Sequence, residues 1–206
     1  MALLPILEIP HPLLRQRAKK VHNIDSSTLR LAYDMVDTMR EAYGIGLAAN
    51  QVGILKRLIV VQLPEDEEAS IYINPEIVHR EGEREVEEGC LSIPGYRGFI
   101  TRSVWVRFSA MDHTSKVVQL KAEEVLSQAL EHEVDHLNGI LYSDHLEEHQ
   151  QLIPVPVEPD GEDDAAHEDE DVVRLSTPVE SSPEIVVGEL GESAGPTETP
   201  ASLKVK

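Results

Sequence analysis

The last quarter of this 206-residue chain has a composition that cannot form a packed core. Residues 154–206 contain 14 acidic and three basic side chains, seven of the thirteen prolines, and no Phe, Tyr or Trp. Such a stretch buries too little apolar surface to offset the conformational entropy that folding removes. We therefore expect residues 1–153 to form one domain and residues 154–206 to form a disordered, Pro-containing acidic tail. The alternative for the tail is a small ordered element at residues 184–190.

The composition of the whole chain argues against several classes of protein. A formal net charge of −20 argues against a nucleic-acid binder, because contacts with phosphate need clustered Lys and Arg. One cysteine rules out an internal disulfide framework and a four-cysteine zinc module. No apolar run reaches the ~20 residues of a membrane span. The N-terminal sequence MALLPILEIPHPLLRQR lacks the pattern of a secretory signal. We expect a soluble protein of a reducing compartment.

Hydrophobic periodicity predicts helices towards both ends of the domain and strands between them. Ser26 or Ser27 is expected to cap a helix whose apolar residues recur every three or four positions and which Gly44 ends. A second helix is expected from about Ala122 to Asn138. Four segments are typical of strands: Arg57–Leu63, Ser70–Ile77, Ser103–Met111 and Lys116–Lys121. Because helices and strands do not alternate along the chain, we predict the α+β class.

The second predicted helix contains the sequence HEVDH at residues 132–136. His132 and His136 are four residues apart, so both imidazoles lie on one helix face and can bind the same metal ion. Glu133 lies about 100° further round the helix and can act as a general base towards an attacking water. HExxH also occurs by chance in long helices, where its side chains are merely solvated. Leucines on the side of Glu133 favour the metal site, because a partly buried carboxylate without a partner is costly.

A catalytic metal site needs a third protein ligand and an open position. Tyr142 stands where the extended motif HExxHxxGxxH requires its third His, and Asp144 and His145 are weaker alternatives. Cys90 is the other candidate, in the turn-rich segment EGCLSIPG between strands, although a lone Cys is more often a small buried apolar residue. The segment GIGLAANQVG, residues 44–53, offers glycines that let a ligand approach the backbone, or only a tight packing turn.

The sequences GIGLAANQ, EGCLS and HEVDH, in this order, closely resemble the three motifs of the peptide deformylases over roughly residues 9–146. The resemblance implies an α+β fold in which antiparallel strands surround a central helix that carries HExxH. It implies a metal-dependent hydrolase that removes the formyl group from the N-terminal formylmethionine of newly made polypeptides and releases formate. Iron(II) is the usual ion of the family, and zinc, nickel and cobalt are the alternatives.

The resemblance also assigns roles to individual residues. The metal ligands that it implies are Cys90, His132 and His136, with Glu133 as the general base. The Gln51 side chain and the main-chain N–H of Leu91 would stabilise the oxyanion, and each such donor is typically worth about 10²–10³ in rate. Gly46 would hold the substrate backbone. Three residues are expected to line an apolar pocket for methionine: Ile45, Val125 and Ala129.

Two residues depart from the family pattern. Glu131 stands where Gln is common, and Gln128 lies where a methionine pocket would favour an apolar side chain. Both departures concern substrate preference, since neither residue is at a ligand position. Two alternative functions follow from the residues: an HExxH endopeptidase, and a non-catalytic deformylase-like protein that binds chains and recruits a basic partner through its tail.

The expected partners are N-formylmethionyl nascent peptides and, transiently, the ribosome. We expect the protein in the cytoplasm or in an organelle of bacterial origin. The acidic tail predicts no direct binding of the tail to nucleic acid, because phosphate repels it. All implied ligands and donors precede Leu146, so truncation after Leu152 is expected to leave formate release and stability nearly unchanged.

Overall fold

The computed structural model describes residues 2–147 and 150–155, so nearly all of the predicted tail lies outside the described residues. The domain limits therefore stay a prediction. In chain order the elements are η1 Pro12–Arg15, α1 Ser26–Glu41, β1 Gly46–Ala48, η2 Ala49–Val52, β2 Leu58–Val61, β3 Ser70–Glu81, β4 Arg84–Cys90, β5 Ile93–Arg102, β6 Trp105–Met111, β7 Val117–Glu123, α2 Glu124–Leu137, η3 Tyr142–His145 and β8 Ile153–Pro154.

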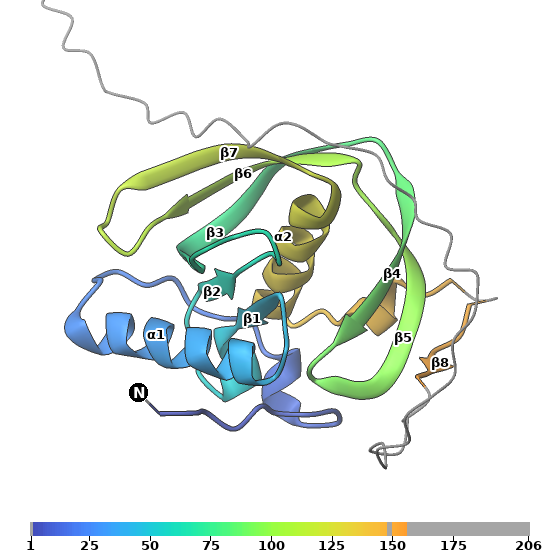
Figure 1. Ribbon diagram of the computed structural model, residues 1–206, viewed down its shortest axis with the longest axis horizontal. Helices are drawn as coiled ribbons and strands as arrows, with labels where there is room; N and C mark the ends of the chain where they lie inside the picture. The colour runs from blue at the N-terminus through green and yellow to red at the C-terminus, as the bar shows by residue number, and fades with distance from the viewer. Residues whose placement is uncertain (1, 148–149, 156–206) are drawn as a thin grey trace, which may run out of the picture.

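The strands form two antiparallel sheets. One sheet has five strands in the order β1-β2-β3-β6-β7, and the other has three in the order β4-β5-β8. The helix α2 lies between them, whereas α1 packs against β1 and β2 at the outside of the larger sheet (Figure 1). This arrangement confirms the predicted α+β class with antiparallel strands. Among the described residues, no helix is both long and apolar enough to cross a membrane.

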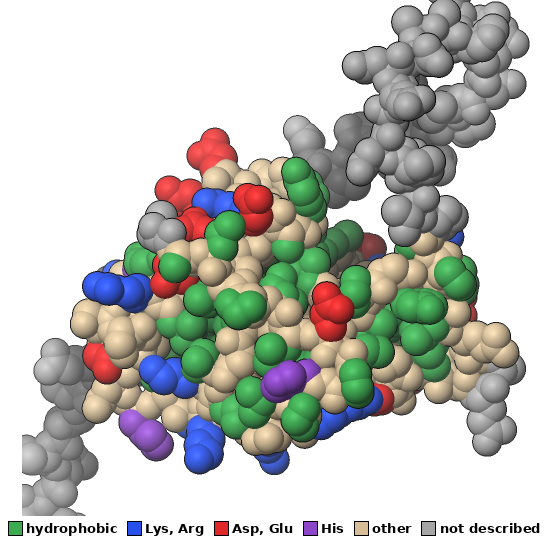
Figure 2. All heavy atoms as spheres, turned by 90° about the horizontal axis from the view of Figure 1, so that it is seen from below, with side chains coloured by type: hydrophobic (Ala, Val, Ile, Leu, Met, Phe, Trp, Pro, Cys, Tyr) green, Lys and Arg blue, Asp and Glu red, His purple; other side chains and the backbone are tan. Residues whose placement is uncertain are grey.

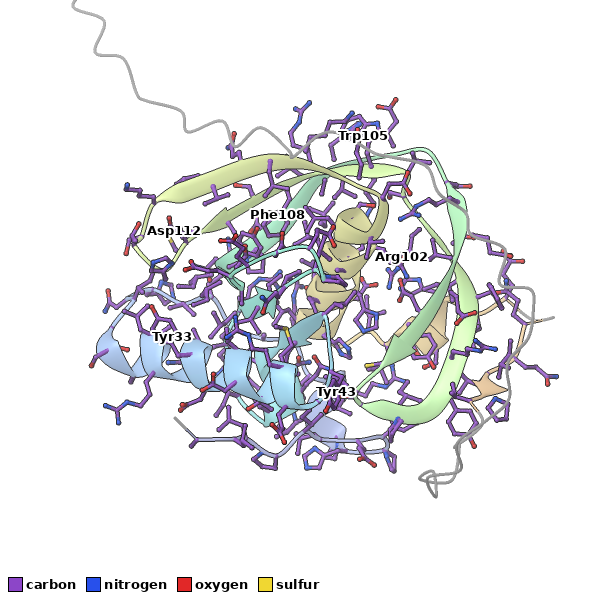
Figure 3. All side chains as sticks on the ribbon, in the orientation of Figure 1. Tyr33, Tyr43, Arg102, Trp105, Phe108 and Asp112 are labelled. Carbon is purple, nitrogen blue, oxygen red and sulfur yellow. The ribbon has the colours of Figure 1, made fainter. Side chains whose placement is uncertain are left out.

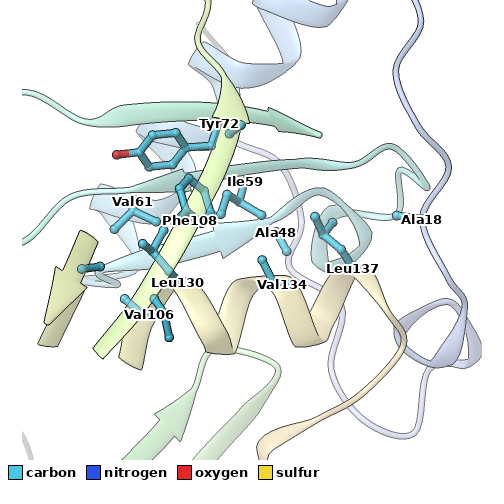
Figure 4. Packing of buried hydrophobic residues seen from close by; sticks show 13 residues of the cluster. Ala18, Ala48, Ile59, Val61, Tyr72, Val106, Phe108, Leu130, Val134 and Leu137 are labelled. Atoms are coloured by element: carbon cyan, nitrogen blue, oxygen red, sulfur yellow. The ribbon is translucent and has the colours of Figure 1, made fainter. Parts of the chain in front are cut away.

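The core forms where α2 meets the larger sheet. Leu130, Val134 and Leu137 on α2 pack against residues of β2, β3 and β6, including Ile59 and Phe108 (Figure 4). All five side chains are almost entirely buried, and burying such a side chain stabilises the fold by about 1.5–3 kcal/mol. This packing holds α2 firmly, so the side chains on its other face have fixed positions.

The first helix begins and ends differently from the prediction. Its N-cap is Asp25, whose Oδ1 accepts a hydrogen bond from the Thr28 N–H at 2.8 Å, so neither Ser26 nor Ser27 is the cap. The left-handed residue after the helix is Tyr43, with φ of 54°, and the following Gly44 N–H closes the turn on the Met39 carbonyl at 2.9 Å. A Cβ on Gly44 would lie 2.8 Å from Leu91 Cδ1, so a larger residue here would have to displace the end of the Leu91 side chain.

The second sheet is absent from the sequence prediction. The segment around Cys90 was expected to be a turn-rich connection, but Cys90 is the last residue of β4, and β4 pairs with β5. The charged residues of β4 stand in two adjacent pairs, Arg84–Glu85 and Glu87–Glu88, which interrupt the alternation of a half-buried strand and leave a weak hydrophobic signal. The four predicted strands correspond to β2, β3, β6 and β7 with shifted ends, and β3 continues four residues further, to Glu81.

Candidate metal centre and active site

Three potential metal ligands from two elements converge between the sheets. Cys90 Sγ, at the end of β4, lies 3.1 Å from His136 Nε2, and the Nε2 atoms of His132 and His136 on α2 are 3.2 Å apart. One ligand atom from each residue lies within 4.8 Å of the other two. Ligands of a tetrahedral ion bound at about 2.0–2.3 Å are spaced roughly 3–4 Å apart. The three side chains therefore fit a single metal ion.

The hydrogen bonds and burial of these three side chains leave the atoms that face one another available to bind an ion. His132 Nδ1 lies 2.8 Å from Glu88 Oε2, and this contact orients the ring so that its Nε2 faces Cys90 and His136. Burial lowers the pKa of His136 well below its usual value, so its imidazole is neutral and can coordinate. Cys90 Sγ accepts hydrogen bonds from the Ser92 N–H at 3.4 Å and from Gln51 Nε2 at 3.7 Å, which hold the sulfur in place beside the two imidazoles.

A buried chain of charged groups extends outward from His132. Glu88 accepts two hydrogen bonds from Arg102, at 2.8 and 3.0 Å, and the same guanidinium pairs with Asp135. Arg102 lies between α2 and the β4–β5 hairpin (Figure 3). Burial raises the pKa of Glu88, but the hydrogen bonds from His132 and Arg102 outweigh it and hold the pKa at about 2. Glu88 is therefore a carboxylate, which orients His132.

The outer end of this chain reaches the surface at His145. His145 Nε2 lies 2.8 Å from Asp135 Oδ2, beside a surface pocket of about 730 Å³ that Arg102 and Asp135 also line. The alternative ligands Asp144 and His145 are thus engaged elsewhere: Asp144 pairs with Arg15, and neither residue belongs to the cluster with Cys90. The third ligand that the structure brings to the two histidines is Cys90.

Glu133 is a buried carboxylate held against a glycine. Only 4% of the residue is exposed, and its Oε2 has no hydrogen-bond partner among the described residues. A Cβ on Gly46 would lie 2.9 Å from Glu133 Cδ, so β1 can approach this carboxylate only with glycine at that position. Burial raises the pKa of Glu133 to about 7. A carboxyl group with a pKa near neutrality is suited to accept a proton and to return it.

The two predicted oxyanion donors lie at the same centre. Gln51 is 1% exposed, its Oε1 accepts from the Ala48 N–H at 2.8 Å, and its Nε2 points towards Ser92 Oγ at 3.2 Å and Cys90 Sγ. The amide orientation is fixed by these contacts. Leu91 follows Cys90 directly, and within the described part of the chain its main-chain N–H donates no hydrogen bond. Both groups can therefore donate to a substrate oxygen beside the metal cluster.

The predicted substrate residues differ in exposure. Ile45 and Val125 are 40% and 48% exposed, whereas Ala129 is buried and packs in the core with Leu130. Gly46 belongs to β1, an edge strand of the larger sheet whose outer side has no paired strand among the described residues. Hydrophobic side chains also occupy the middle of the lower face of the molecule (Figure 2). A free strand edge can pair with an extended peptide.

Sequence reasoning missed the residues that support the ligands: Glu88, Arg102 and Asp135. Glu88 could have been found, because it lies two residues before Cys90, and residues i and i+2 of a strand share a face. That signal depends on recognising β4. Arg102 and Asp135 give no local signal, since their pairing joins segments 33 residues apart.

The two departures from the family pattern have structural roles. Glu131 is buried and accepts hydrogen bonds from the Ser103 N–H at 3.0 Å, the Ser103 hydroxyl at 3.1 Å and Arg80 Nε at 2.9 Å. It therefore ties α2 to β3 and to the connection between β5 and β6, and it contacts no proposed ligand. Gln128 Nε2 donates to the Glu87 carbonyl at 2.9 Å and ties α2 to β4.

Comparison with known proteins points to one family. Residues 3–152 match the family model described as polypeptide deformylase. The chain is 51% identical over 152 residues to the peptide deformylase of Dehalococcoides mccartyi strain CBDB1, which covers 74% of this chain and 91% of that protein. It is 42% identical over 173 residues to the peptide deformylase of Thermomicrobium roseum, and this match covers 81% of this chain and 98% of that protein.

Comparison with solved structures points to the same family. A peptide deformylase from Legionella pneumophila has a TM-score of 0.69 and 42% identity, and the match covers 71% of this chain and 88% of that one. A peptide deformylase from Synechococcus elongatus, in complex with actinonin, has a TM-score of 0.68 and 39% identity, covering 71% and 80%.

Proposed function

The chain belongs to the peptide deformylase family, and from this premise we propose that it hydrolyses the N-formyl group of N-formylmethionyl polypeptides and releases formate. The observation that carries the proposal is the convergence of Cys90, His132 and His136 beside the buried carboxylate of Glu133. The two products are formate and the polypeptide with a free N-terminal amine. Extended nascent peptide would pair with the free edge of β1 near Gly46.

We assign Cys90, His132 and His136 as the ligands of one divalent ion. When bound there, such an ion polarises a carbonyl and makes a water more acidic. Thiolate and imidazole accept zinc and iron(II) alike, so ligand softness does not choose between them. The family resemblance favours iron(II), with nickel or cobalt as active replacements. We expect activity that decays in air with iron and persists with nickel, and air-stable full activity with zinc would contradict this choice.

The chain's own residues move the proton and stabilise the charge. Glu133 takes a proton from the water as its oxygen bonds to the formyl carbon. The Gln51 Nε2–H and the Leu91 N–H donate to the oxyanion that forms on the former carbonyl oxygen. Glu133 then gives this proton to the departing nitrogen, and the C–N bond breaks to give a free amine and formic acid, which loses the second proton of the water to become formate. Ile45, Val125 and Ala129 are proposed to contact the methionine side chain.

Formate release from formyl-Met-Ala-Ser tests the proposed function directly. The endopeptidase alternative predicts cleavage of internal peptide bonds and metal binding that survives Cys90→Ala. The non-catalytic alternative predicts binding of the peptide without formate. We expect formate release, and we expect Cys90→Ala to lose the metal. Cleavage of internal peptide bonds would favour the endopeptidase instead, and peptide binding without formate release would favour the non-catalytic protein.

Association with the ribosome and a location in the cytoplasm, or in an organelle of bacterial origin, stay predictions. Co-sedimentation of the full chain with ribosomes at low salt tests the first of them.

A further inference from the structure

A basic pocket lies outside the proposed active site. Its volume is about 460 Å³, and none of the proposed ligands or catalytic residues lines it. Its charged lining consists of four basic side chains and one acidic side chain: Arg17, Lys20, Arg57, Arg80 and Glu76. This gathering of positive charge is unexpected in a chain with a net charge of −20.

Arg57 is a buried cation that has no carboxylate in direct contact among the described residues. The residue is 7% exposed, and its guanidinium donates only to neutral acceptors, Asn138 Oδ1 at 3.0 Å and the Pro75 carbonyl at 2.9 Å. Within the described part of the chain, Arg57 forms no ion pair with a carboxylate. The other buried guanidinium, Arg102, pairs with two carboxylates. Because a buried charge is costly unless it is paired, Arg57 is expected to have an anionic partner from outside this part of the chain.

The groups around Arg57 add to the electrostatic cost of its charge, and a bound anion would lower this cost. Burial and the neighbouring guanidinium of Arg17 lower the pKa of Arg57, and the more distant carboxylate of Glu76 opposes them without outweighing them. Arg17 itself is exposed and forms no ion pair among the described residues. Lys20 pairs with Glu76 at 3.1 Å, but both side chains are more than half exposed, and such a pair contributes little. Arg80, the fourth basic side chain, pairs with Glu131 at 2.9 Å, so the uncompensated positive charge at the pocket belongs mainly to Arg57 and Arg17.

Main-chain hydrogen bonds hold the pocket in shape. The Arg57 N–H donates to the Lys19 carbonyl at 2.8 Å, and the Ala18 N–H donates to the Leu137 carbonyl at 2.8 Å. The Arg57 carbonyl accepts from the Asn74 N–H at 2.8 Å. The N-terminal segment, the start of β2, β3 and the end of α2 are thus tied together. A pocket built in this way needs little rearrangement to bind a ligand.

We propose that this pocket binds a small phosphate-bearing anion, with Arg57 as the buried anchor and Arg17 and Lys20 at its mouth. A guanidinium fork pairs with two oxygens of a phosphate group, and several cations around one pocket suit an anion with more than one charge. The volume is in the range of pockets for small molecules. The proposal is independent of the deformylase reaction.

Calorimetric titration of the metal-loaded full chain with tripolyphosphate, at physiological ionic strength, tests the proposal. We expect saturable binding that Arg57→Gln weakens about tenfold or more, because a charged hydrogen-bond partner is lost. Arg17→Gln and Lys20→Gln, at exposed positions, should weaken it less. Glu76→Gln should tighten it, because the carboxylate that competes for Lys20 is removed. The control is Arg30→Gln, an exposed arginine on α1 outside the pocket, which should change nothing.

Formate release should be unchanged in the Arg17, Lys20 and Glu76 variants, so the proposed function and this site can fail separately. Absence of tripolyphosphate binding, or weakening by Arg30→Gln equal to that by Arg17→Gln, would overturn the proposal. Equal affinity for citrate would show that the site does not select phosphate. Tighter binding of a short single-stranded RNA would make nucleic acid the ligand. Much tighter tripolyphosphate binding after truncation beyond Val155 would show that the chain's own carboxylates fill the pocket.

Discussion

Burial gives Glu133 a different chemistry from that of an ordinary surface glutamate. Its pKa is raised to about 7, and Gly46 is the residue that lets β1 pack against its carboxyl group. Glu133→Ala should retain the metal while losing most of the formate release, because a proton acceptor is removed and a ligand is not. Metal content and turnover measured on the same sample check this. Metal loss as large as that of His132→Ala would show that Glu133 has been given the wrong role.

Glu88 is expected to act on the proposed metal ion through His132. Its carboxylate fixes the imidazole, and outer-shell partners of this kind are typically worth about 10–100-fold in metal affinity. Glu88→Gln should therefore weaken metal binding by about that factor in a chelator competition. The matched control is Glu87→Gln on the same strand, where the carboxylate is exposed and pairs with Arg97. Equal metal affinity in the two variants would refute the orienting role.

At the scale of elements, α1 depends on a capping carboxylate at its first turn. Hydrogen bonds from the Ser27 hydroxyl and the Thr28 N–H lower the pKa of Asp25 from 3.8 to about 2. A lowered folded-state pKa stabilises the fold above the unfolded value of 3.8, and this contribution is lost as the pH falls towards 2. Asp25→Ala should lower the Tm at neutral pH, and the difference from the native chain should shrink below pH 4.

Asp25→Asn provides the control, because Asn still accepts the capping hydrogen bond but does not titrate. Its Tm should stay above that of Asp25→Ala at every pH. A Tm difference between the native chain and Asp25→Ala that is the same at pH 3 and pH 7 would exclude the capping carboxylate as its cause.

Elements with a strong local pattern were predictable from the sequence, and those defined by pairing were not. The apolar spacing of α1 and four of the five strands of the larger sheet carry their own signal. In contrast, β4 has charged residues in adjacent pairs and β5 contains Pro94, Gly95 and Gly98, so both are recognised only through their pairing. The same distinction between a local sequence signal and long-range contacts applies to the residues of the candidate active site. Cys90, His132 and His136 stand in recognisable motifs, but Arg102 becomes part of the site only through its contacts with Glu88 and Asp135.

At the scale of the whole molecule, the charge of the chain is unevenly distributed. Residues 154–206 have 14 acidic and three basic side chains, whereas a basic pocket lies among the residues that precede them. The last described strand, β8, pairs Ile153 with Arg97 and Pro154 with Tyr96, and the Val155 N–H donates to the Gly95 carbonyl at 2.9 Å. The small sheet therefore includes residues beyond Leu152, where the sequence alone suggested that the chain could be cut.

Two truncations separate the contribution of β8 from that of the acidic segment. A chain ending at Val155 keeps every described contact of β8, so its formate release and Tm should match those of the full chain. A chain ending at Leu152 loses the β5–β8 pairing and should have a lower Tm with nearly unchanged turnover, because all proposed ligands and donors precede it. Removing the acidic segment should not weaken ribosome co-sedimentation, since phosphate repels carboxylates and this repulsion is strongest at low salt. Loss of ribosome binding at low salt in the chain ending at Val155 would instead show that the acidic segment carries a docking site.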